Sequence, residues 1–212
     1  MRLLKDPYFA NVPSMQPAKQ RTALCFHAKD DPAEVRYEVY KLLRQLNLRF
    51  FAVVRSKLDV VSFVKQQNER DPKYHYRPDE LYDTLVKELF KDRMHKAQVL
   101  HVCYAKRGNK NRDAAFRRSL TLAVTEFEQG FGFKPNVQMN VSSSSPPFEA
   151  GLQAVDYYLW ALQRYYELGE DRFIRMLWDQ VGEIHDLDRV HDGRRGVLFT
   201  RNVPLPENPE VT

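Results

Sequence analysis

Two kinds of apolar pattern alternate along this chain, and their alternation limits the folds it can adopt. Residues 49–56 and 98–105 are apolar on both faces, which is typical of strands covered on both sides. Between such runs, apolar residues recur every three or four positions, as on an amphipathic helix. The first of these helical stripes consists of Val35, Val39, Leu42 and Leu46. Strands that alternate with helices predict an α/β fold, with a central mixed, mostly parallel sheet and helices on both faces.

The same patterns predict where each element lies. Strands are expected at residues 22–27, 49–56, 98–105 and 137–141, and helices at residues 32–47, 58–68, 78–91, 113–128 and 149–168. Asp31 is the predicted N-cap of the first helix, with Pro32 at its first position. We expect a single α/β domain over residues 22–200. An irregular lead at residues 1–21 precedes it, and a loose tail at residues 201–212 follows.

Composition and charge limit the classes of protein to which this chain can belong. The longest apolar runs, such as residues 50–54, fall far short of the roughly 18 residues of a membrane helix, so no membrane partner is expected. Cys25 and Cys103 each lie in an apolar run and are predicted to be reduced core residues of a cytoplasmic protein. The net charge of +5 favours a nucleic-acid partner only where the basic residues cluster.

Asp156 is the sharpest single candidate for chemistry. On the helix predicted at residues 149–168, it falls beside a face made of five apolar residues. That predicted face consists of Leu152, Val155, Leu159, Leu162 and Tyr166. A carboxylate near the packed side of a helix must be paired, bound to a metal or functional, because burying it alone is costly. The alternative is a purely structural hydrogen bond or ion pair.

Two further groups lie where predicted strands end, which is where ligands gather in open α/β sheets. His27 and Asp30 follow the first strand and could meet a metal or a phosphate, although a hydrogen-bonded histidine at the edge of the core is an equal alternative. A basic loop at residues 106–112 contains Arg107 and Lys110, and Lys57 follows another strand. Together these basic residues predict a rim suited to phosphodiesters, with a merely solvated loop as the alternative.

The segment at residues 185–192 contains His185, Asp186, Asp188, His191 and Asp192, which are residue types of a metal site. Their spacing matches no metal-binding template, and a polar loop packed by Trp178 and Leu187 is predicted there instead. The sequence contains no glycine-rich phosphate loop, nucleophile elbow or Cys-x-x-Cys pair.

Two motifs make residues 22–200 resemble a bacterial family catalogued as domain of unknown function 3800. They are Phe26-His27-Ala28-Lys29-Asp30-Asp31 and Gly151-Leu152-Gln153-Ala154-Val155-Asp156-Tyr157. The resemblance implies a ribonuclease-H-like fold and a Mg²⁺-dependent nuclease acting on nucleic acid. It implies that Asp156 and Asp30 are metal ligands and that His27 helps to position metal or water. Lys57, Arg107 and Lys110 would meet phosphates, and the side chains of Asp156 and His27 should come within roughly 10 Å.

This chain departs from that family in one respect. Members usually begin with a strand ending in Asp-Glu-Ser-Gly, whose aspartate is the first metal ligand, and no such motif precedes Phe26. Either that strand lies upstream of Met1, which we favour because residues 1–9 do not resemble a central strand, or the protein is a remnant that binds without cutting. In both cases these 212 residues alone should show little or no cleavage. The rival functions are a non-catalytic nucleic-acid-binding or interaction module, and an unrelated metallohydrolase using His27 with His185 or His191.

Overall fold

The computed structural model describes residues 25–106, 112–191 and 193–207, and shows a mixed α/β protein. The chain forms two compact units, each assembled from segments that are distant in sequence. Unit 1 takes the described residues up to Phe50, then Ser144–Gly182 and the chain from Thr200. Unit 2 takes Phe51–Ser143 and Glu183–Phe199. Because the chain passes between the units several times, no linker composition could have marked their boundary.

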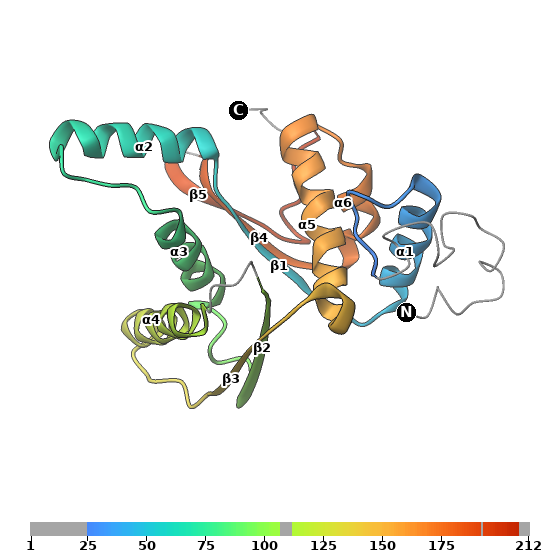
Figure 1. The fold of residues 1–212 in the computed structure, drawn as a ribbon, viewed down its shortest axis with the longest axis horizontal. Helices are drawn as coiled ribbons and strands as arrows, with labels where there is room; N and C mark the ends of the chain where they lie inside the picture. Colours follow the sequence, from blue (N-terminus) through green and yellow to red (C-terminus); the bar gives the residue numbers. More distant parts are fainter. Residues whose placement is uncertain (1–24, 107–111, 192, 208–212) are drawn as a thin grey trace. The chain divides into compact units, whose positions relative to one another are not determined.

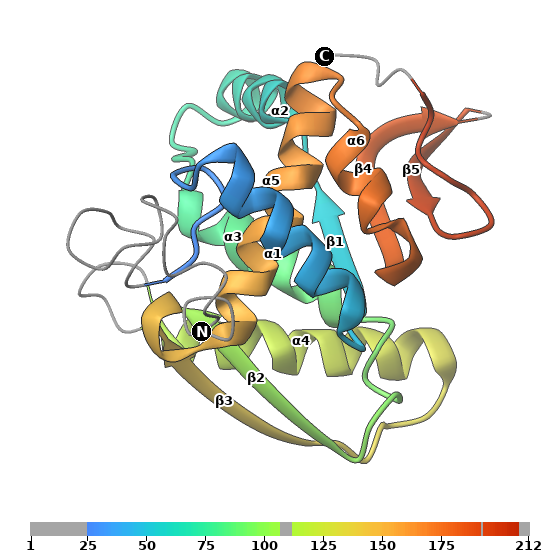
Figure 2. The ribbon, with the colours of Figure 1, turned by 90° about the vertical axis from the view of Figure 1, so that its right-hand side faces the viewer.

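Unit 1 is mainly helical. Its elements are α1 (Ala33–Gln45), η5 (Pro146–Phe148), α5 (Ala150–Leu168), α6 (Arg172–Met176) and η6 (Trp178–Gln180). Figure 2 shows α1, in blue, lying against α5, in orange. The rings of Tyr40 and Tyr157 meet edge to face at this contact, with their centroids 5.3 Å apart. Both side chains are fully buried, so aromatic packing between α1 and α5 is the centre of this core.

The buried face of α5 differs from the predicted one. Val155 and Leu159 are about half exposed, whereas Tyr157, Ala161 and Tyr165 are fully buried. These three residues are spaced four apart and therefore share one side of the helix. The prediction was wrong for Val155 and Leu159, whereas Leu162 is buried as predicted. The reason is that α5 is apolar around most of its circumference. Periodicity alone could not choose between a leucine and valine side and a tyrosine side.

Unit 2 contains most of the strands. Its elements are β1 (Phe50–Val54), α2 (Lys57–Arg70), α3 (Pro78–Phe90), β2 (Val99–Ala105), α4 (Asp113–Phe131), β3 (Gln138–Ser144), β4 (Val181–His191) and β5 (Arg194–Phe199), with β1, β3 and β4 each extending slightly beyond it. The described strands form two sheets, of order β1-β4-β5 and β2-β3, instead of the one central sheet expected. The strand predicted at residues 22–27 accounts for part of the difference. Residues 22–24 lie outside the described residues, and residues 25–27 are not in a strand.

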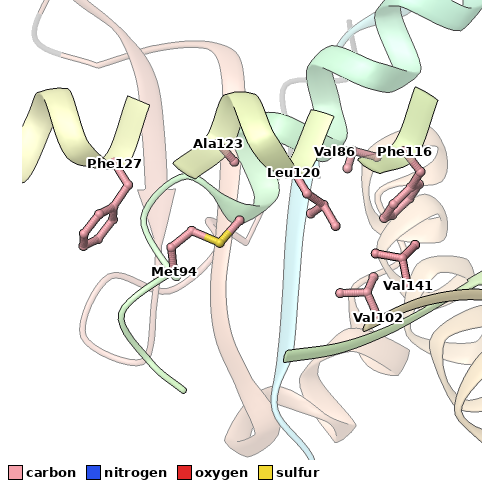
Figure 3. Close-up of a cluster of buried hydrophobic side chains, with 8 residues drawn as sticks. All are labelled: Val86, Met94, Val102, Phe116, Leu120, Ala123, Phe127 and Val141. Carbon is pink, nitrogen blue, oxygen red and sulfur yellow. The ribbon is translucent and has the colours of Figure 1, made fainter. Parts of the chain in front are cut away.

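The β2-β3 sheet packs on one face only. The amide of Gln138 donates to the carbonyl of Gln98, which joins the starts of the two strands and makes them parallel. Helices α3 and α4 cover one face (Figure 1), and Val102 and Val141 point toward α4 in the cluster drawn in Figure 3. On the other face, His101 and Cys103 are exposed. The prediction that this strand is covered on both faces, with Cys103 in the core, was therefore wrong.

The segment predicted as a polar loop at residues 185–192 is strand β4 for all of its described length. It pairs antiparallel with β5, and its register shifts between Asp186 and Val190. Asp186 is buried and accepts hydrogen bonds from the amides of Asp188 and Arg189, which lie inside this irregularity. Its carboxylate therefore stabilises the bulge. None of the described helices is long and apolar enough to cross a membrane.

Candidate functional site

A tight turn carries the first motif into α1. The amides of Asp30 and Asp31 both donate to the carbonyl of His27, at 3.0 and 2.9 Å. Asp31 does not cap the helix as predicted. Pro32 is the N-cap residue, and no side chain caps the helix there. Asp31 instead points inward, where its Oδ2 accepts the amide of His27 at 2.9 Å and the hydroxyl of Tyr157 at 2.5 Å.

Helix α5 holds this turn through side chains of the second motif. The amide of Phe26 donates to Gln153 Oε1 at 3.0 Å, and the amide of Ala28 donates to Asp156 Oδ2 at 2.8 Å. Gln153 and Asp156 are three residues apart on one helix face, so they can accept from alternate amides of an extended chain. Arg36 adds a hydrogen bond to the carbonyl of Ala28 at 3.1 Å. The two motifs therefore form one local structure, although they are more than 120 residues apart in sequence.

This arrangement brings together three of the predicted site residues. Nδ1 of His27 lies 3.9 Å from Asp156 Oδ2 and 3.8 Å from Asp30 Oδ2. The side chains of His27, Asp30 and Asp156 are 46%, 38% and 35% exposed, so solvent reaches all three. The Nδ1 atom itself is buried, and it has no hydrogen-bond partner among the residues that the structure describes. Both carboxylate distances are too long for a hydrogen bond.

The carboxylate of Asp156 can also accept further hydrogen bonds or bind a metal ion. Oδ2 accepts from Ala28, while no residue of the described chain donates to Oδ1. Magnesium is usually bound by one or two carboxylates, with water and substrate phosphates completing its octahedral shell. Asp156 and Asp30 supply that number of carboxylates. Within the described ranges, no group of three or more His, Cys, Asp or Glu side chains is arranged to hold a metal. With two carboxylates as its protein ligands, an ion here would take most of its shell from water and substrate.

Cys25 reports on the charge at this site. Its pKa is raised, first by burial and then by the negative charges of Asp31 and Asp156. Because the thiolate is the reactive form, a raised pKa lowers reactivity near neutral pH.

We expect an alkylating agent such as iodoacetamide to modify Cys103 faster than Cys25 at pH 8. Cys103 is exposed, whereas Cys25 is partly buried and its thiolate is disfavoured by two carboxylates. Mass spectrometry of the two cysteine peptides at successive times gives both rates. Replacing Asp156 by asparagine should accelerate modification of Cys25 and leave Cys103 unchanged. Equal acceleration of both thiols would indicate general unfolding instead.

The other predicted site residues belong to unit 2 or lie outside the described residues. Lys57 is exposed at the start of α2 in unit 2, after the N-cap residue Ser56, whose hydroxyl accepts the amide of Asp59. Arg107 and Lys110 lie outside the described residues. His185 and His191 are strand residues of unit 2.

Asp188, from the loop predicted at residues 185–192, has two polar partners in unit 2. Its Oδ2 accepts the amide of Ser56 at 2.7 Å, and its Oδ1 lies 3.3 Å from Nε of Arg55. Its charge is therefore offset by an arginine, which disfavours a metal ion at this position.

Gln153 and Tyr157 position the site but were missed as functional residues. Both belong to the second motif and flank Asp156 in sequence, at three residues before it and one residue after it. A polar side chain and a tyrosine near an unexplained helix carboxylate were the available signal. Their partners, Phe26 and Asp31, are more than 120 residues away and could not be identified from local pattern.

Comparison of the chain with protein-family models, with curated proteins and with solved structures finds no match. The resemblance to the domain of unknown function 3800 family therefore remains a prediction that rests on the two motifs. What the structure adds is that these two motifs lie against each other in unit 1.

Proposed function

We propose that Asp156 and Asp30 in unit 1 bind Mg²⁺ and, with His27, catalyse hydrolysis of phosphodiester bonds in nucleic acid. The observation that carries the proposal is that His27 Nδ1 lies close to the carboxylates of both Asp30 and Asp156, at 3.8 and 3.9 Å. A ribonuclease-H-like arrangement of the chain is part of the same proposal, as is phosphate binding by Lys57, Arg107 and Lys110.

The contacts favour this function over a purely structural role for Asp156. A structural carboxylate in a protein interior usually accepts several hydrogen bonds or pairs with a cation. Asp156 accepts one amide, its other oxygen has no donor in the described chain, and about a third of the side chain is exposed. The amide of Ala28 fixes the orientation of the carboxylate without neutralising its charge. Asp156 is therefore oriented, negatively charged and accessible, as a metal ligand must be.

His27 has the position of a proton acceptor. About half of its side chain is exposed, so the imidazole can reach a water molecule next to a bound phosphodiester. Nδ1 of His27 lies within 4 Å of the carboxylates of Asp30 and Asp156, so the imidazole would be close to a water held by an ion on those carboxylates. A divalent ion bound here would lower the pKa of water and offset the charge of the phosphate.

Metal binding can be tested separately from cleavage. We expect calorimetric titration with MgCl₂ to show binding to the protein, and Asp156→Asn to weaken it by at least about tenfold, as loss of a charged ligand does. Glu167→Gln is the matched control, because it removes one charge from α5 about 16 Å along the helix from Asp156. Equal Mg²⁺ affinities for Asp156→Asn and the unaltered protein would refute the proposed metal site.

Cys25 provides a second measurement of the same event. A cation at Asp156 opposes the negative charge that raises the pKa of Cys25, so Mg²⁺ should accelerate alkylation of this thiol. The acceleration should disappear in Asp156→Asn and persist in Glu167→Gln. Binding of nucleic acid without any Mg²⁺-dependent cleavage would favour the non-catalytic module over the nuclease.

A further inference from the structure

Unit 2 contains a second candidate site, on the open face of the β2-β3 sheet. A cleft of about 220 Å³ is lined there by residues of β2, β3 and α4. Its polar lining residues are His101, Cys103, Arg117, Asn140 and Ser142. None of them belongs to the cluster proposed for phosphodiester hydrolysis, so the two proposals stand independently.

Strand alternation explains why these polar side chains share one face. On β2, Leu100, Val102 and Tyr104 pack with the core cluster under α4, which leaves His101 and Cys103 on the opposite face. On β3, the core residues are Met139 and Val141, which leaves Asn140 and Ser142 outside. The strands are parallel and begin together, so the two polar pairs lie on the same side of the sheet. The apolar face holds the sheet on its helices, and the polar face is open.

Arg117, on α4, lines the cleft from the edge of β3 that faces away from β2. The amide of Gln138 points toward β2, and successive residues of a strand direct their backbone groups to opposite sides. The carbonyl of Val141, three residues later, therefore points away from β2. Arg117 donates to this carbonyl through Nη2 at 2.9 Å. That bond uses one of the five N–H donors of the guanidinium and holds the group at the edge of the cleft.

The chemistry of the lining points to an anion. Arg117 contributes a permanent positive charge, and no Asp or Glu within the described ranges lines the cleft. His101, Asn140 and Ser142 add side chains able to donate hydrogen bonds. Because the donors come from three different elements, a tetrahedral oxyanion can use more of them than a planar carboxylate can. The cleft is smaller than the roughly 300 Å³ at which sites for drug-sized ligands begin, so it fits one small group.

We propose that this cleft binds a phosphate group, either as free inorganic phosphate or as the phosphate of a mononucleotide. A catalytic thiol is the alternative suggested by the neighbouring His101 and Cys103. In the described part of the chain no hydrogen bond joins this thiol to the imidazole, so the pair lacks the contact by which a histidine activates a cysteine.

Cys103 gives a direct readout, because it lines the cleft while Cys25 lies in the other unit. Alkylation of both cysteines by iodoacetamide is followed by mass spectrometry at constant ionic strength, with inorganic phosphate, adenosine monophosphate or acetate added. We expect phosphate to slow modification of Cys103 by about tenfold at ten times its Kd, through occupancy of the cleft, and to leave Cys25 unaffected. Equal slowing of both cysteines, or equal protection by acetate, would overturn the assignment.

Variants of neighbouring arginines complete the test. Arg117→Ala should abolish the protection, and Arg117→Lys should weaken it, because lysine keeps the charge but loses the forked donor geometry. Arg118→Ala is the matched control, since Arg118 is the next residue of α4 and is exposed, but does not line the cleft. Protection that survives in Arg117→Ala, or that disappears equally in Arg118→Ala, would refute the site. Stronger protection by the nucleotide than by inorganic phosphate would identify the bound group as that of a nucleotide, and equal protection would identify phosphate alone.

Discussion

In a protein that also carries the Asp-Glu-Ser-Gly strand, replacing Asp156 by asparagine is expected to abolish Mg²⁺-dependent phosphodiester cleavage while the protein stays folded. The change removes the negative charge of a carboxylate that accepts the amide of Ala28 and lies next to His27. The loss should reach at least about 100-fold in rate, the scale observed when one charge-stabilising group leaves an active site. Cleavage of labelled single-stranded and double-stranded DNA and RNA over a range of Mg²⁺ concentrations measures it.

The fold should survive this change for a specific reason. The amide oxygen of asparagine can still accept the hydrogen bond from Ala28, so the turn before α1 keeps its link to α5. A thermal unfolding midpoint close to that of the unaltered protein would show this directly. Glu167→Gln should retain full cleavage, since its side chain is exposed and its carboxylate accepts a hydrogen bond from Gln163 on the same helix. Unchanged cleavage in Asp156→Asn would return that residue to a structural role.

Asp30→Asn and His27→Gln test the remaining members of the cluster. If the two carboxylates act on one ion, Asp30→Asn should also weaken Mg²⁺ binding, and its effect should not add fully to that of Asp156→Asn. His27→Gln should reduce cleavage more than it reduces Mg²⁺ affinity, because the proposed role of the imidazole is proton transfer. The ratio of these two effects distinguishes the role of His27 from that of the carboxylates.

Sequence patterns predicted the helices and the apolar strands well. Periodicity placed a helix at residues 113–128 where α4 runs from Asp113 to Phe131, and a helix at residues 149–168 where α5 runs from Ala150 to Leu168. The apolar runs at residues 49–56 and 98–105 contain β1 and β2. In each case the pattern spans one element, so the information is local.

The hairpin of β4 and β5 was missed because its pattern is not that of a regular strand. β4 contains His185, Asp186 and Asp188 among its apolar residues, and its register shifts after Asp186. A bulge interrupts the period of two by which a strand is identified. Charged residues such as those of β4 are typical of a polar loop. Their place in a strand becomes clear only when their partners are known, as with Arg55 beside Asp188.

The candidate site was predictable in its members but not in its contacts. Asp156 was chosen for its place beside a predicted apolar helix face, and His27 and Asp30 because they follow a predicted strand. These three residues do meet. The role of Asp31 was not predictable, because an aspartate before a proline and a helix has the pattern of an N-cap. Asp31 is seen to be an inward-facing acceptor only when the position of Tyr157 on α5 is known, because the Tyr157 hydroxyl donates to it.

That contact leads to the largest expected effect on stability. Tyr157→Phe should lower the free energy of unfolding by about 2 kcal/mol, because the hydroxyl donates at 2.5 Å to the buried carboxylate of Asp31. Hydrogen bonds to charged acceptors are worth more than those between neutral groups, and the carboxylate loses a donor where water cannot easily replace it. Urea unfolding followed by circular dichroism measures the difference.

Tyr158→Phe is the matched control for this effect. Tyr158 is the next residue of α5, is equally buried, and donates at 2.6 Å to the amide oxygen of Gln180, which is uncharged. Its loss should lower the free energy of unfolding by only about 1 kcal/mol, as for an ordinary hydrogen bond. Because both changes delete one hydroxyl from adjacent buried tyrosines, the difference between them isolates the charge of the acceptor. Equal losses would contradict the expectation that the hydrogen bond to the buried carboxylate of Asp31 stabilises the fold more than an ordinary one.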